Sequence, residues 1–264
     1  MNIFSAHRGF CIFMRSMKIT LIGAGNLGTH LYKTFVQHPD IELHQWHNTR
    51  LRSDFTPENI AVIHNFSAIS KESLCILAVA DDAISSVSKQ LHREAFVVHT
   101  SGAVNLNSIS QLRRGVFYPI QSFSPNRSIS FKGLPVGIEA INSIDQTFLK
   151  ALAKMIKAKP IILNSEQRRA LHLAAVLVNN FTNHLYAQAE QLCEAHQISF
   201  DILKPLIRET VEKMETHLPR NAQTGPALRG DKKTIATHLQ SIENKELKAI
   251  YRTITKSIQK LHGN

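Results

Sequence analysis

Three glycines near the start of the chain have the spacing of a phosphate-binding loop. Residues 23–28 read GAGNLG and follow the apolar run KITLIG. In such a loop the first glycine turns the chain, the second leaves room for a pyrophosphate, and the third lets the next helix pack closely. Amides at the start of that helix then face the phosphate charge. A glycine turn without a ligand is the alternative, but the strand before the loop and the helix after it favour a dinucleotide site formed by Gly23, Ala24, Gly25, Asn26, Leu27 and Gly28.

The second expected strand ends without a carboxylate. Sites that prefer NAD place Asp or Glu there, about 20 residues after the glycines, to bind the ribose hydroxyls. This chain has Asn48, Thr49 and Arg50 instead. An arginine pairs with a 2′-phosphate that a carboxylate would repel. The pattern predicts NADP(H) as the cofactor, unless Arg50 is simply a solvated cation of the loop.

Further polar residues follow the later expected strands. Ligands of an open parallel sheet bind beyond the carboxyl ends of its strands. We therefore expect Val79 and Ala80 to contact the cofactor, Ser101 to donate a hydrogen bond in catalysis, and Gln121 and Ser122 to bind substrate. A turn or helix-capping role for the Ser101 hydroxyl is equally consistent with its sequence. Gln121 and Ser122 could equally tie their loop to the sheet.

A polar stripe follows one face of a long expected helix. His172, Asn179, Asn183 and Tyr186 lie at positions i, i+7, i+11 and i+14. A face that holds His, Asn and Tyr but no Lys or Glu is typical of a hydrogen-bonded cleft rather than of a solvated surface. We expect His172 to act as acid or base, Asn179 to assist it, and Asn183 to bind substrate. A purely structural histidine is the alternative.

The segment AQTGPALRGDKKT joins two later helices. Its Gly and Pro give the turn a defined shape. Within it we expect Thr224 to bind substrate and Arg229 to pair with a substrate carboxylate. Asp231 is better placed to cap the next helix. A structural role for the whole loop remains open.

Strands and helices alternate over the first part of the chain. Apolar runs predict strands at 18–23, 41–47, 61–64, 74–80, 95–102, 115–119, 134–141 and 160–164. Such alternation predicts an α/β fold, with a doubly wound, mostly parallel sheet that has helices on both faces. Asp81 is a candidate cap for the helix that contains Ile84 and Val87.

The alternation of strands and helices ends at Asn164, which begins a capping box with Gln167. We expect one long helix from there to about residue 197 and further helices near 199–217, 231–241 and 243–261. The expected domains are an unstructured extension at 1–16, a Rossmann-type NADP-binding domain at 17–163 and an all-helical domain at 164–264.

Composition excludes several other classes of protein. The chain has 264 residues, of which 43% are hydrophobic and 19% charged, as in ordinary globular proteins. Its net charge is +11, but the basic residues are scattered, so nucleic-acid binding is a weak alternative. Three separated cysteines argue against a disulfide framework or a metal site. No apolar stretch reaches the roughly 20 residues that span a membrane, so we expect a cytoplasmic protein.

Six motifs occur in the order of a known family: MKITLIGAGNLG, ILAVADDAI, VVHTSGAV, GVFYPIQSFS, SEQRRALHLAAVLVNNFTNHLY and AQTGPALRGD. From Met17 onward the chain resembles Rossmann-like proteins with a DUF2520 helical domain, which are labelled NADP oxidoreductases. Their architecture is similar to that of pyrroline-5-carboxylate reductase, prephenate dehydrogenase and β-hydroxyacid dehydrogenases, with a helical domain like the C-terminal domain of 6-phosphogluconate dehydrogenase. The resemblance implies hydride transfer between NADP(H) and a small carbonyl, imine or hydroxy substrate bound between two domains. We also expect a homodimer, which is the commonest oligomer.

Two departures keep other functions open. Prephenate dehydrogenases have His-Pro where this chain has Tyr118 and Pro119. β-Hydroxyacid dehydrogenases have a Lys four residues before an Asn, where this chain has Ala175 and Val176. The missing lysine and the tyrosine at position 118 favour an alternative, a non-catalytic binding or regulatory protein that responds to NADP(H). Hydride exchange with a deazaflavin is a third possibility.

Overall fold

The computed structural model describes residues 16–263. Apart from Ser16, the extension expected at 1–16 lies outside this range. The chain divides into two compact units, residues 1–179 and 180–264. The division expected near residue 163 marks the end of the sheet, whereas the first compact unit also includes the helix that follows.

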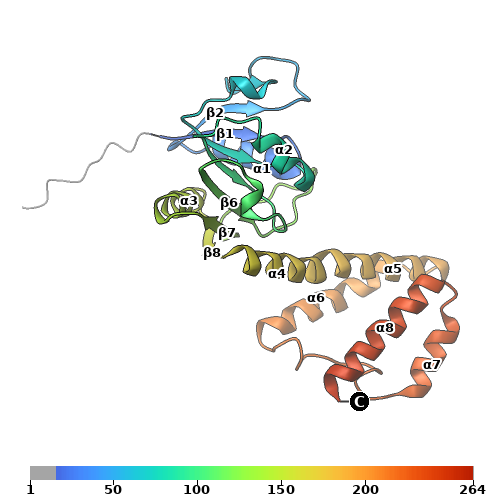
Figure 1. Cartoon of the computed structure of the whole chain (residues 1–264). Coiled ribbons are helices and arrows are strands. Elements are labelled where there is room, and N and C mark those ends of the chain that lie inside the picture. Colours follow the sequence, from blue (N-terminus) through green and yellow to red (C-terminus); the bar gives the residue numbers. More distant parts are fainter. Residues whose placement is uncertain (1–15, 264) are drawn as a thin grey trace, which may run out of the picture. The chain divides into compact units, whose positions relative to one another are not determined.

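The first unit is built on one sheet, which confirms the expected α/β class (Figure 1). Within residues 16–263 the sheet has eight strands in the order β3-β2-β1-β4-β5-β6-β7-β8. All neighbours are parallel except β6 and β7. The eight expected strands are confirmed as β1 (Met17–Ile22), β2 (Ile41–His47), β3 (Ala61–Ile63), β4 (Leu74–Leu77), β5 (Phe96–His99), β6 (Arg113–Pro119), β7 (Pro135–Ala140) and β8 (Lys159–Ile162).

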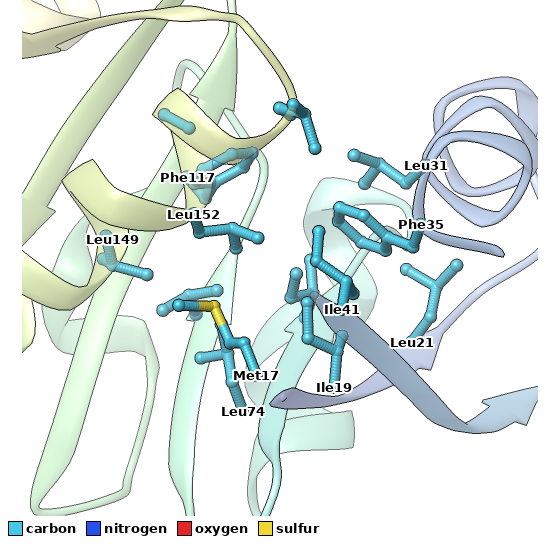
Figure 2. Close-up of a cluster of buried hydrophobic side chains, with 14 of the residues drawn as sticks. Met17, Ile19, Leu21, Leu31, Phe35, Ile41, Leu74, Phe117, Leu149 and Leu152 are labelled. Atoms are coloured by element: carbon cyan, nitrogen blue, oxygen red, sulfur yellow. The ribbon is translucent and has the colours of Figure 1, made fainter. Parts of the chain in front are cut away.

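Both faces of the sheet are covered by helices, as the apolar strands require. On β4, Leu74 and Ile76 point to one hydrophobic cluster, whereas Cys75 and Leu77 point to the other. The first cluster is completed by helices α1 (Asn26–Val36) and α3 (Ser143–Met155), and the second by α2 (Ile84–Ser88). Figure 2 shows the first cluster, with side chains of α1 and α3 meeting those of β1 and β4. Alternate side chains of one strand therefore serve two cores.

The strand order reverses between β1 and β4. From β1 the chain continues outward to β2 and β3, and it then returns to add β4 on the other side. Loops that leave β1 and β4 in opposite directions open a crevice at their carboxyl ends, which is where ligands bind in such sheets.

Helix α4 (Ser165–Ala175) begins with the expected capping box. The Asn164 side chain accepts the amide of Gln167, and the Gln167 side chain accepts the amide of Asn164. The expected single helix to about residue 197 is corrected, because residues Val176–Phe181 form a π-helical segment before α5 (Thr182–Ala195). A wider turn changes the direction of every later side chain. The polar stripe from His172 to Tyr186, which assumed 3.6 residues per turn, is therefore not continuous.

The second unit is helical, as expected. It contains α5, α6 (Lys204–Glu212), α7 (Lys232–Ser241) and α8 (Lys245–His262). Asp231 caps α7 by accepting the Thr234 amide, which confirms its expected role. Pro205 lies in the first turn of α6, where its missing amide costs nothing.

The expectation that Asp81 caps α2 is wrong. A 3₁₀ turn at Asp81–Ala83 precedes α2, and Ala80 is the residue at its N-cap position. No side chain makes a capping hydrogen bond there. The Asp81 carboxylate is thus not engaged in capping.

One buried arginine fixes the start of α4 to the sheet. The Arg168 side chain is fully buried. Its Nη1 donates to the carbonyl oxygens of Ser101 (3.0 Å) and Gly102 (3.1 Å) in the loop after β5. Its Nη2 and Nε donate to Oε2 of Glu139 on β7, at 3.1 and 3.3 Å. A buried charge persists only when it is paired and hydrogen bonded in this way.

Arg168→Met should lower the free energy of unfolding by about 3–5 kcal/mol, because it leaves the Glu139 carboxylate and two carbonyls without their donor. Urea unfolding followed by the fluorescence of Trp46 measures this change. Arg169→Met, at the exposed neighbouring position, is the matched control and should change stability little. Equal stability of the two variants would contradict the role given to Arg168.

Candidate functional site

A cleft of about 440 Å³ lies at the carboxyl ends of β1, β4 and β5. It is therefore next to the point where the strand order reverses. Its walls come from the glycine loop, the loops after β4, β5 and β6, and one side chain of α4. The lining residues are Gly25, Asn26, Leu27, Ala78, Val79, Ala80, Asp81, Thr100, Ser101, Gly102, Tyr118, Pro119, Gln121, Phe123 and His172.

The three glycines of the loop differ in the space around them. A Cβ atom at Gly23 would lie 2.2 Å from the carbonyl oxygen of Ala78, and one at Gly28 would lie 2.4 Å from the carbonyl oxygen of Gly23. Gly23 also has φ of +109°, which side-chain-bearing residues rarely adopt. A Cβ at Gly25, by contrast, would meet no atom within 4 Å. Packing therefore requires glycine at 23 and 28, whereas at 25 the missing side chain leaves open space on the cleft wall.

The N-terminus of α1 has the properties of an anion site. Gly25 is its N-cap residue, so no side chain caps it, and no acidic residue lies in its first turn. The free amides and the helix dipole both favour negative charge there. Asn26 Nδ2 donates to the carbonyl of Phe123 at 3.1 Å, which ties the loop after β6 to the glycine loop.

Arg50 lies against the glycine loop. Its Nη1 donates to the carbonyl of Ala24 at 3.2 Å, and its side chain is exposed. The buried Asn48 forms the turn beneath it, because Asn48 Oδ1 accepts the Arg50 amide at 3.0 Å. The guanidinium is thus held beside the glycine loop, whereas Asn48 Oδ1 is occupied by the backbone amide of Arg50.

The loop after β5 is held by its own side chains. Ser101 Oγ accepts the amides of Ala103 and Val104, both at 3.0 Å. The Ser101 amide donates to Nδ1 of the buried His99 at 3.2 Å. Burial, and secondly the charge of Arg168, lower the pKa of His99 to about 3. His99 is therefore neutral near pH 7 and keeps Nδ1 as an acceptor. Ser101 thus stabilises a turn as a hydrogen-bond acceptor, which leaves its own hydroxyl hydrogen available to a ligand.

His172 lies beside Tyr118 at the cleft. Tyr118 Oη and His172 Nδ1 are 3.2 Å apart. The two rings meet edge to face, with centroids 6.0 Å apart and an interplanar angle of 72°. Burial raises the pKa of Tyr118, and the charge of Arg168 opposes that rise. The pair joins β6 to α4 at the cleft wall.

The cleft brings together part of the expected site. Eight of the expected residues line it, namely Gly25, Asn26, Leu27, Val79, Ala80, Ser101, Gln121 and His172. Six expected residues do not line the cleft. Gly23, Ala24 and Gly28 belong to the glycine loop itself, Arg50 contacts it, Asn48 supports the turn of Arg50, and Thr49 is exposed between them. Ser122 and Asn179 are exposed and do not line it. Asn183, Thr224 and Arg229 belong to the second unit, where Thr224 lines an apolar pocket with Leu185, Pro226 and Ala227.

Three residues of the site were not anticipated from sequence. Arg168 reads as a surface residue of an amphipathic helix, Tyr118 as part of a buried strand, and Phe123 as a loop residue. The contacts that define them join positions 54 to 97 residues apart. No local pattern encodes such pairs, although two consecutive arginines near the start of the helix were a weak signal for Arg168.

A second cavity of about 1080 Å³ lies at the amino ends of the parallel strands, at the end of the sheet opposite to the cleft. Its lining includes the first residues of β1, β4, β5 and β6, which are Met17, Leu74, Phe96 and Arg113. Amino ends of parallel strands lack the crevice at which α/β proteins bind ligands. Size therefore does not make it the functional site.

Among residues 16–263, no cluster of three His, Cys, Asp or Glu side chains has the arrangement of a metal site. Within the same residues, no helix combines the length and apolar character needed to cross a membrane.

Comparisons with known proteins agree with this geometry. The family model described as "Domain of unknown function (DUF2520)" matches residues 134–258. The sequence matches no curated protein significantly. Among solved structures, a "putative NADP oxidoreductase" from Bacteroides fragilis is 33% identical, and the match covers 95% of this chain and 100% of the other with a TM-score of 0.80.

Two more distant structures show the same fold. An imine reductase from Myxococcus stipitatus in complex with NADP⁺ is 17% identical with a TM-score of 0.64, over 93% of this chain and 96% of the other. A pyrroline carboxylate reductase from Plasmodium falciparum with NADP bound is 14% identical with a TM-score of 0.57, over 95% and 98%. The expected architectural similarity to pyrroline-5-carboxylate reductase is confirmed. Because the full-length match to the Bacteroides fragilis protein reaches 33% identity, the chain belongs to the same family, the Rossmann-like proteins with a DUF2520 domain.

Proposed function

We propose that this chain is an NADP(H)-dependent oxidoreductase that transfers hydride between the nicotinamide and a small carbonyl, imine or hydroxy compound. The observation that carries the proposal is the open space at Gly25 on an uncapped helix N-terminus. Packing accounts for Gly23 and Gly28 but not for Gly25, so a ligand that approaches the backbone is the remaining reason for glycine there. The names of the related Bacteroides fragilis protein and of the NADP-bound imine reductase support the same cofactor.

The residues present fit this cofactor. The amides of the glycine loop would hold the pyrophosphate, Arg50 with Thr49 and Asn48 would face the 2′-phosphate, and Val79 and Ala80 would flank the dinucleotide. When bound, the nicotinamide supplies the hydride. The cleft that continues from Gly25 to His172 offers the adjoining space for substrate.

The remaining polar groups would orient the substrate and supply the proton. Ser101 carries a hydroxyl hydrogen at the cleft, Gln121 carries an amide there, and His172 carries an imidazole there. We also propose that Asn179 assists catalysis. The further residues proposed to bind substrate are Ser122, Asn183, Thr224 and Arg229.

The general experiment is a fluorescence titration with NADPH and NADH, followed by an absorbance screen for cofactor oxidation with cyclic imines, 2-oxo acids and ketones. We expect tighter binding of NADPH and turnover of at least one class. Tight binding of NADPH without turnover of any compound would favour a non-catalytic, NADP(H)-responsive protein instead.

We also propose that a second copy of the chain covers the helical unit. Within its described residues, 180–263, only Ala227, Ile242 and Thr255 are buried. Large apolar side chains are exposed from α5 through α6 and beyond, among them Leu192, Ile198, Ile202, Leu206, Val211, Met214 and Leu218. A monomer rarely exposes so extensive an apolar surface. A twofold dimer would bury the same patch of both copies against each other.

Gly25→Val should weaken NADPH binding at least tenfold while leaving the thermal midpoint unchanged, because the added side chain occupies open space that the pyrophosphate needs. Gly28→Ala is the paired variant. Its methyl group would press on the Gly23 carbonyl, so the thermal midpoint should fall. Fluorescence titration and thermal unfolding measure both effects. Normal NADPH binding by Gly25→Val would refute the cofactor assignment.

Arg50→Ala should weaken NADPH binding about tenfold, the loss of one charge-assisted hydrogen bond, and leave NADH binding unchanged. The 2′-phosphate is the group that differs between the two nucleotides. Arg52→Ala, at an exposed position two residues on, is the control and should keep the preference for NADPH. An unchanged preference in Arg50→Ala would remove the 2′-phosphate role of this residue.

Leu206→Glu should convert the dimer to a monomer at micromolar concentration, because it places a charge in the apolar surface of α6, where Leu206 is 63% exposed. Arg208→Glu introduces the same side chain about 200° around the helix and should leave the dimer intact. Light scattering after gel filtration reports the mass. A monomeric wild-type chain would overturn the dimer.

A further inference from the structure

Tyr118 combines a protonated hydroxyl with a place in the cleft wall. It extends from the penultimate position of β6 and is 8% exposed. Among the cleft residues, its hydroxyl lies within hydrogen-bond distance of His172, which comes from α4. Burial raises the pKa of Tyr118 above its usual value, so the phenol keeps its proton through the neutral range. A group of this kind holds a proton until a stronger acceptor arrives.

The loop after β5 is shaped around this pair. A Cβ atom at Gly102 would lie 2.5 Å from His172 Nδ1 and 2.8 Å from Tyr118 Cζ. Any side chain at 102 would therefore push the two rings apart. The carbonyl of Gly102 is held by Arg168, one helical turn before His172. The backbone thus leaves room at this point for the contact between Tyr118 and His172.

We propose that Tyr118 is the residue that delivers the proton to the substrate and that His172 positions and reloads it. This inference rests on the proposed hydride transfer and changes which side chain meets the substrate. This role requires the tautomer in which His172 Nδ1–H donates to Tyr118 Oη at 3.2 Å, because the phenol hydrogen is then directed away from the imidazole and toward a ligand.

Reduction of the substrate takes one hydride and one proton. Hydride forms a C–H bond at the substrate carbon of a C=N or C=O group, which is reduced while NADPH is oxidised. The O–H bond of Tyr118 breaks, and an N–H or O–H bond forms on the substrate. The phenolate then takes the Nδ1 proton of His172 while Nε2 accepts one from solvent, so water supplies the net proton.

Tyr118→Phe keeps the ring that packs beside Gly102 and removes only the hydroxyl. We expect its NADPH affinity to stay within twofold of wild type and its rate of NADPH oxidation to fall roughly 100-fold, the usual contribution of a general acid. The probes are the cyclic imine and ketone that wild type reduces best. Tyr251→Phe is the matched control, because Tyr251 forms a similar pair with His238 in the second unit, at 2.8 Å, and the rate should not change.

The pH profile separates a proton donor from a structural tyrosine. The groups facing Tyr118 are His172 and Arg168 from α4, and Asp81 lines the same cleft. With fluorotyrosine at position 118, whose phenol is more acidic, the alkaline limb of the rate should move to lower pH. The ¹⁹F titration midpoint of that residue should also shift when His172 is replaced by Ala.

The outcomes distinguish the inference from the proposed function. Full activity of Tyr118→Phe, or an alkaline limb that fluorotyrosine does not move, would overturn the proton delivery by Tyr118 and leave hydride transfer standing. A ¹⁹F titration midpoint that stays the same in His172→Ala would overturn the pairing of Tyr118 with His172. NADPH binding by wild type without oxidation of any probe would refute both the oxidoreductase and the proton donor.

Discussion

The buried guanidinium of Arg168 holds together the parts from which the cleft is made. A charge removed from water is tolerated only with a counterion and a full set of acceptors. Arg168 finds them in Glu139 on β7 and in the carbonyls of Ser101 and Gly102. The same contacts fix the polar loop after β5, an interior strand of the sheet and the first turn of α4. His172, four residues further along α4, consequently faces the cleft.

The residues at the two ends of the cleft differ in how far apart they lie in the sequence. At the cofactor end, Gly23, Gly25 and Gly28 act within six consecutive residues, because strand, turn and helix follow directly. At the other end, Tyr118 and His172 come from β6 and α4 and meet only after the sheet has formed. The spacing of the first arrangement is encoded locally, although Gly23 also packs against the carbonyl of Ala78 after β4. The second arrangement exists only in the tertiary fold.

This difference decides what could be predicted from the sequence. Eight strands, the α/β class and the capping box at Asn164 follow from local spacing and were predicted. The π-helical segment at Val176–Phe181 was not, since the apolar pattern there fits an ordinary helix as well. Asn179 was assigned to a stripe with His172 on that assumption. Arg168, whose side chain is fully buried, was missed because its partners lie far away in the sequence.

Each end of the cleft has its own source of positive potential. At the cofactor end the uncapped N-terminus of α1 provides the positive potential. At the other end it comes from Arg168, whose charge lowers the pKa of His99 and works against the raised pKa of Tyr118. Burial and, secondly, the charge of Arg168 keep His99 neutral, so that its Nδ1 accepts the Ser101 amide. The charge of Arg168 also favours a negative charge on Tyr118, the charge that appears when the phenol gives up its proton. Arg168, whose contacts hold the fold together, thus also acts on the pKa values of His99 and Tyr118, after burial.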